Sequence, residues 1–123
     1  MLTWRLRVAY IVGIMAAAAL GEFEVLVLLA VLHLGDDAGP PAIRTEIERR
    51  ARRAVARGAV YVTLDRLEAK RLLSSETRDD DVPRPGRPQR AYRVSARGLH
   101  AVKRALASVE RMRAGLEPLL DGQ

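Results

Sequence analysis

The stretch RGAVYVTLDRLEAKRLL, residues 57–73, combines arginines with apolar residues that recur every three or four positions. Val60, Leu64, Leu67 and Leu72 fall on this repeat, which predicts the buried side of a helix. The positions between them carry groups that can contact nucleic acid. A guanidinium pairs with guanine or phosphate, a side-chain methyl contacts the methyl group of thymine, and a tyrosine hydroxyl donates to phosphate.

A helix with this arrangement can lie in the major groove of duplex DNA, with its first turns toward the bases and its apolar stripe toward a core. Gly58 and Ala59 are small, so the start of the helix can approach the DNA backbone closely. An alternative for Tyr61 is a half-buried ring that packs against a neighbouring helix. The residues predicted to contact double-stranded DNA on this helix are Arg57, Gly58, Ala59, Tyr61, Val62, Thr63, Arg66 and Lys70.

The cations later in this helix have a second interpretation. Asp65 and Glu68 are interleaved with Arg66, Lys70 and Arg71. Oppositely charged residues three or four positions apart form ion pairs on a solvated helix face. Phosphate binding and internal ion pairing therefore both remain open for these cations.

A second basic group lies in a polar segment rich in proline. Arg84, Arg87 and Arg90 surround Gly86, after the acidic run at 79–81. Arginines in a loop beside a DNA-reading helix suit a wing that follows the minor groove or the phosphates. We predict that these three arginines contact DNA, with the acidic run facing away or paired with arginine.

Composition supports a polyanionic partner and excludes several chemistries. The 123 residues contain 21 Lys and Arg against 15 Asp and Glu, and residues 40–123 hold 19 basic against 11 acidic residues, an excess of eight. Such a basic region favours nucleic acid over membrane. Cysteine is absent, which excludes thiolate metal sites and is compatible with a reducing cytoplasm. His33 and His100 have no carboxylate at metal-ligand spacing, so we predict no enzyme activity, no cofactor and no metal site.

The first twenty residues form an apolar extension. Its apolar stretch, residues 8–20, has thirteen residues, fewer than the ~20 that span a bilayer. Three interpretations are open: a secretory signal, an additional helix, or a translation start at Met15. We favour the last two over membrane contact.

The remaining pattern predicts helices over residues 21–34, 42–53 and 57–70, a hairpin of strands at 73–77 and 90–95, and a helix from Ser95 to about Leu120. This order is that of a winged helix-turn-helix at 21–95, followed by a C-terminal dimerisation helix at 96–123. The predicted fold class is therefore mainly α with a small β-hairpin.

The last helix carries an apolar seam that the chain itself has no second long helix to cover. A symmetry-related copy could cover it, as in a coiled coil, whereas the alternative is packing on the first helix. The predicted dimerisation residues are Leu99, Val102, Leu106, Val109 and Leu116.

The runs LGEFEVLVLLAVLHLGDDA, AIRTEIERR, RGAVYVTLDRLEAKRLL and GRPQRAYRVSARG resemble the PadR family of bacterial transcriptional regulators, in the group with a short C-terminal part, over about residues 20–113. The resemblance implies a winged-helix homodimer, usual action as a repressor and, in some members, release from DNA by small aromatic or drug-like molecules. The residues that match its motifs are Tyr61, Leu64, Arg66 and Leu67 in the DNA-reading helix and Gly86, Arg87, Arg90 and Tyr92 in the wing.

Four positions depart from the family pattern. Gly39 and Pro40 replace a usual tyrosine and glycine, Ala56 stands where serine or threonine would cap a helix, and Arg71 replaces a glycine at a helix end. These departures concern local geometry rather than the fold.

Together these patterns predict a homodimeric, sequence-specific regulator of transcription, a repressor that binds an inverted-repeat operator in the bacterial cytoplasm. The competing hypothesis is a winged-helix module for protein contact or RNA binding. A small-molecule effector follows only from the resemblance, because the chain has few aromatic residues to line a pocket.

Overall fold

A computed structural model describes residues 4–8, 19–78 and 89–122 of the chain. Residues 4–8 are helical, and the first long element is α2, Glu22–Leu34. At its start the Gly21 N–H donates to Glu24 Oε1 at 3.0 Å, which satisfies one of the free amides of the first turn. The helix ends at Gly35, whose φ of 60° suits glycine. Because Val27 and Leu28 are fully buried, α2 is the central helix of the core.

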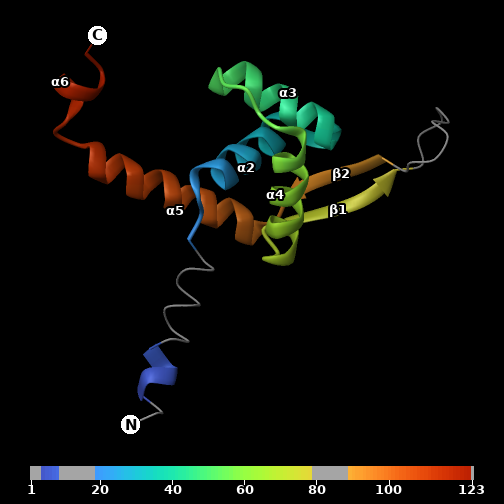
Figure 1. Cartoon of the computed structure of the whole chain (residues 1–123), viewed down its shortest axis with the longest axis horizontal. Coiled ribbons are helices and arrows are strands. Elements are labelled where there is room, and N and C mark those ends of the chain that lie inside the picture. Colours follow the sequence, from blue (N-terminus) through green and yellow to red (C-terminus); the bar gives the residue numbers. More distant parts are fainter. Residues whose placement is uncertain (1–3, 9–18, 79–88, 123) are drawn as a thin grey trace.

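Two helices follow and cross α2. The short 3-10 turn η1, Gly35–Asp37, leads to α3, Pro40–Ala51, and the turn after α3 leads to α4, Arg57–Ala69. α3 begins two residues earlier than predicted, because Pro40 at its first position needs no amide partner there. The α3–turn–α4 unit packs on α2, as Figure 1 shows.

The wing is an antiparallel hairpin of β1, Leu73–Arg78, and β2, Gln89–Val94. Leu73 pairs with Val94 and Arg78 with Gln89, so the register is continuous over six positions. The Tyr92 N–H donates to the Ala38 carbonyl at 2.9 Å, which fixes β2 beside the segment between η1 and α3. The observed strands confirm the predicted hairpin to within a few residues.

α5, Ala96–Arg113, leaves the core and points away from the winged body, which is the unit formed by α2, α3, α4, β1 and β2 (Figure 1). The prediction that this helix continues to about Leu120 was wrong. It ends at Arg113, Gly115 takes a φ of 90°, and a separate short helix α6, Glu117–Leu120, follows. A φ of this sign breaks the helix, and Pro118 lies in the first turn of the next one.

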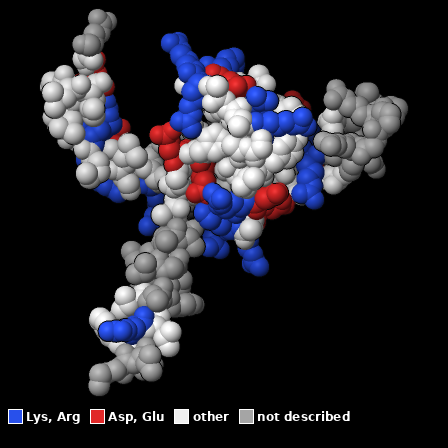
Figure 2. All heavy atoms as spheres, viewed as in Figure 1, with Lys and Arg blue, Asp and Glu red and all other residues white. Residues whose placement is uncertain are grey.

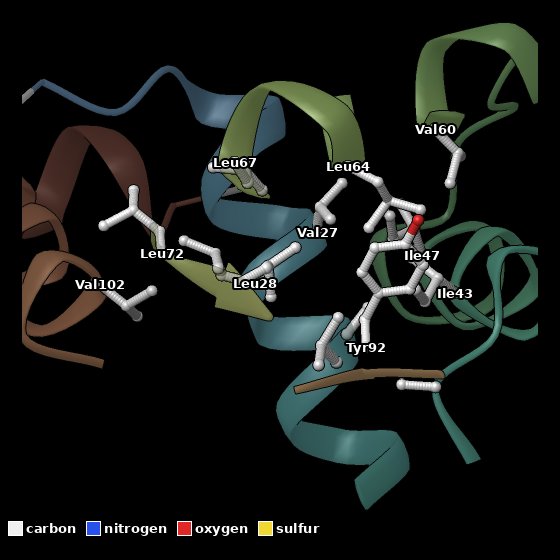
Figure 3. Close-up of a cluster of buried hydrophobic side chains, with 14 of the residues drawn as sticks. Val27, Leu28, Ile43, Ile47, Val60, Leu64, Leu67, Leu72, Tyr92 and Val102 are labelled. Atoms are coloured by element: carbon white, nitrogen blue, oxygen red, sulfur yellow. The ribbon is translucent and has the colours of Figure 1, made fainter. Parts of the chain in front are cut away.

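One apolar cluster holds these elements together, and Figure 3 shows its main side chains. Every helix of the winged body contributes to it, whereas α5 contributes through its first turns. None of the described helices is both long and apolar enough to cross a membrane. The labelled side chains of the cluster are Val27, Leu28, Ile43, Ile47, Val60, Leu64, Leu67, Leu72, Tyr92 and Val102.

Candidate nucleic-acid interface

The turn before α4 is fixed by polar contacts to α3. The Arg44 side chain donates to the Val55 carbonyl at 2.8 Å, and the Val55 N–H donates to Glu48 Oε2 at 3.1 Å. Val55 itself is buried. Arg53 in the same turn lies 5.7 Å above the Phe23 ring and pairs with Glu22, which attaches the turn to α2. The position of α4 is therefore set by groups from both preceding helices.

The start of α4 is open to solvent. Ala56 provides no side-chain cap, and the Ala59 N–H donates to the Ala56 carbonyl at 3.1 Å. Arg57, Gly58 and Ala59 are all exposed. A Cβ placed on Gly58 would have no atom within 4 Å, so the described fold does not require glycine at this position.

The exposed face of α4 continues with Tyr61 and Val62. The Arg57 guanidinium lies 5.8 Å from the centre of the Tyr61 ring, a cation–π arrangement one helical turn apart. Tyr61 is 38% exposed, which is compatible with the half-buried alternative as well as with contact to DNA. Val62 is 56% exposed and is the most exposed large apolar side chain of α4.

Thr63 differs from the expectation. Its side chain is only 6% exposed, because it falls three residues after Val60 and therefore on the core stripe of the helix. The assignment of its methyl group to base contact is thus corrected. The same spacing rule, applied to the sequence, would have placed Thr63 inside.

Lys70 is engaged within the protein. Its Nζ lies 2.9 Å from Glu24 Oε2, and both side chains are largely covered. Burial alone would raise the pKa of the Glu24 carboxyl, but the hydrogen bonds from Gly21 and Lys70 and the charges of Lys70 and Arg66 outweigh it and lower the pKa below 4.5. The ion pair joins the end of α4 to the start of α2. Lys70 therefore forms an ion pair within the protein, but with Glu24 of α2 in a largely covered position rather than with Asp65 or Glu68 on a solvated face of α4.

The residue that ends α4 in a left-handed backbone conformation is an arginine, not a glycine. Arg71 has a φ of 62°, its N–H donates to the Glu68 carbonyl, and the Leu72 N–H donates to the Leu67 carbonyl, each at 2.9 Å. These two bonds define a Schellman ending, in which glycine is usual at the left-handed position. The departure seen at Arg71 therefore places a side chain in strained backbone.

The described part of the wing adds Arg90. This residue is half exposed, and its guanidinium lies 3.8 Å from Glu68 on α4, which links wing and helix. Arg84 and Arg87, with the acidic run at 79–81, lie outside the described residues.

Two further cations lie on the strands of the wing. Arg78 and Arg93 pair with Asp37 and Asp36 of η1, at 3.9 and 3.2 Å. Sequence reasoning missed these pairs because their partners are more than forty residues away. It also did not single out Arg52, which is exposed in the turn before α4. Figure 2 shows blue spheres spread over the face that carries α3 and α4, with white spheres between them and smaller red patches.

The apolar seam of α5 divides into two parts. Val102 is 2% exposed and belongs to the core, so its assignment to dimerisation is corrected: it packs within the chain, as the alternative stated. Leu99, Leu106 and Val109 are exposed, and so is Leu116, which precedes α6 rather than lying on α5. Met112 extends this row and was not identified from the sequence, although it lies three residues after Val109.

Comparisons with known proteins agree with this architecture. The family model described as transcriptional regulator PadR-like family matches residues 28–104. A solved structure of a PadR-like transcription factor from Bacteroides fragilis superposes with a TM-score of 0.63 at 23% identity, over 88% of this chain and 96% of that chain. A PadR family transcriptional regulator from Eggerthella lenta DSM 2243 gives 0.62 at 20% identity, over 100% of both chains. No curated protein matches the chain.

Proposed function

Because the chain belongs to the transcriptional regulator PadR-like family, a family of DNA-binding regulators rather than enzymes, we propose that it acts as a homodimeric repressor that reads an inverted-repeat operator through α4. This action takes place on chromosomal DNA in the bacterial cytoplasm. Repression follows if the bound dimer covers promoter DNA.

The exposed start of α4 is the observation that carries the proposal. Arg57, Gly58, Tyr61 and Val62 lie on the side of α4 away from its buried stripe, which is the placement that a groove-reading helix requires. Arg57 brings a cation to this side, and Arg90 brings another from the wing. Arg66 provides further positive charge near the helix end, whereas Lys70 serves mainly to hold α4 on α2.

The exposed row of α5 and its continuation supports a dimer. Leu106, Val109 and Met112 are between about half and four-fifths exposed, on the part of α5 that extends beyond the core. Exposed apolar rows of this kind are usually covered by another chain. In a two-fold dimer the same row on both copies would meet, with Leu99 and Leu116 at its two ends. Two α4 helices would then face major grooves about 34 Å apart.

Selection of bound sequences from a random pool of duplex DNA tests this function. The expected result is a recovered inverted repeat, bound with an affinity that falls steeply as salt increases, because phosphate contacts release counterions. Failure to bind any duplex DNA, or equal binding to all sequences, would refute operator recognition. Tight binding to single-stranded RNA instead would favour the competing RNA-binding hypothesis.

A small-molecule effector is not part of this proposal. Tyr92 is buried in the core and Tyr61 lies beneath Arg57 on α4, so neither offers a free aromatic wall at the exposed row of α5.

A further inference from the structure

Resting on the proposed function, we infer that Val62 is a specificity-determining residue that selects thymine at one position of each half-site by contact with its C5-methyl group. The inference deepens the DNA-binding role of α4. The inference identifies the thymine methyl as the group in the major groove that α4 contacts. Neither the charge of the chain nor its fold specifies that group.

The outward stripe of α4 lacks the usual polar readers. Direct readout of guanine or adenine relies on two-pronged contacts from arginine, lysine, asparagine or glutamine. Helix α4 has no lysine, asparagine or glutamine, and its two arginines lie at its ends. Arg57 lies over the Tyr61 ring, and Arg66 is close enough to Glu24 to lower the pKa of that carboxyl. The middle of the helix therefore has no side chain suited to reading purines.

Val62 is placed for an apolar contact with a base. Gly58 lies about one turn before Val62 on the same side of the helix, and neither Gly58 nor Ala59 projects far from the backbone. A Cβ at Gly58 would have no atom of the described residues within 4 Å, so the space beside Gly58 is open to a DNA surface. Val62 thus projects beyond the preceding turn.

The thymine methyl is the apolar group that the major groove presents to such a side chain. Thr63, the other methyl-bearing side chain of this turn, is buried and does not compete for the role. Tyr61 is less exposed than Val62 and has Arg57 over its ring. Among the described residues of α4, Val62 therefore provides the free apolar contact.

Replacement of single thymines by deoxyuridine in the selected operator tests the inference, because it removes the methyl group and keeps the base pair. We expect one thymine per half-site at which the replacement weakens wild-type binding about fourfold, the effect of losing one buried methyl-sized group. Val62→Ala should abolish this difference, and Val62→Thr, which keeps one methyl, should retain part of it. Because Val62 is exposed, both variants should keep the thermal unfolding of the wild type.

The outcomes separate the two proposals. If the wild type binds its operator and no thymine shows a methyl effect, or if Val62→Ala shows the same effect as the wild type, the inference is wrong while operator recognition stands. If the wild type selects no operator at all, operator recognition and the inference both fail.

Discussion

The Ser95 hydroxyl donates a hydrogen bond of 2.8 Å to the Arg71 carbonyl and accepts one of 3.0 Å from the Gly98 N–H. It thereby joins the strained end of α4 to the first turn of α5. A Cβ at Gly98 would come within 2.1 Å of the Leu72 carbonyl oxygen, so α5 approaches the backbone that follows α4 as closely as glycine allows. Helix α4 and the exposed row of α5 are thus connected through one compact contact.

Ser95→Ala should lower the free energy of unfolding by about 1–2 kcal/mol, because it removes the cap of α5 and a bond to the end of α4. Denaturation by urea at one fixed protein concentration measures this change. Ser108→Ala, an exposed site on the same helix, is the matched control and should change stability by less than about 0.5 kcal/mol. Equal effects of the two variants would contradict the capping role.

Arg71→Gly should raise the free energy of unfolding by about 1 kcal/mol, because glycine takes a φ of 62° without the clash of a Cβ. Arg71→Ala removes the same charge and keeps the strained Cβ, so it should leave stability near that of the wild type. The comparison of the two variants in urea isolates backbone strain. A gain with alanine as large as with glycine would assign the effect to charge instead.

Glu24→Gln should lower the free energy of unfolding at pH 7 by about 1–3 kcal/mol, because the bond to Lys70 loses its charged acceptor. The pKa of Glu24 is lower in the folded chain than its ordinary value of 4.5, so the carboxylate stabilises the fold above that pH. Its contribution is lost as the pH falls through the folded pKa. Unfolding of both proteins between pH 7 and pH 3 should show their stabilities converging in acid, and a constant difference would argue against the linkage.

Leu106→Glu should weaken self-association at least about 100-fold, because a charge would enter an apolar contact without a partner. Sedimentation equilibrium measures the dimer dissociation constant. The side chain is 46% exposed in the single chain, so circular dichroism should show an intact fold. Ala107→Glu adds the same charge about 100° further around α5, outside the apolar row, and should leave association unchanged. A dimer unaffected by Leu106→Glu would exclude this row as the contact.

Arg57→Ala should weaken operator binding and reduce the salt dependence by about one counterion if the guanidinium contacts phosphate. If the variant loses affinity for the operator but not for random duplex DNA, Arg57 contacts a base instead. Titrations against operator and random duplex at several salt concentrations distinguish these two roles. Arg111→Ala, near the far end of α5, is the control, and full affinity of Arg57→Ala for both duplexes would remove Arg57 from the interface.

Some features of α4 could be read from the sequence because they depend on local periodicity. Val60, Leu64 and Leu67 recur at helical spacing, and the structure buries all three. The same spacing also predicts that Thr63 is buried, because it lies three residues after Val60, but Thr63 was predicted to contact DNA. The ending at Arg71 was also visible, since a left-handed position is expected where the family pattern has glycine.

The sequence by itself determined the order of the elements, the hairpin and the buried stripe of α4, because each follows from spacing along a few turns or from turn residues. Only the tertiary structure decided that Lys70 pairs with Glu24, 46 residues away, and that Val102 lies inside while Leu106 lies outside on the same apolar row. A helical repeat defines a face but not what covers it. That depends on where α5 leaves the core and on which distant charges the fold brings within reach.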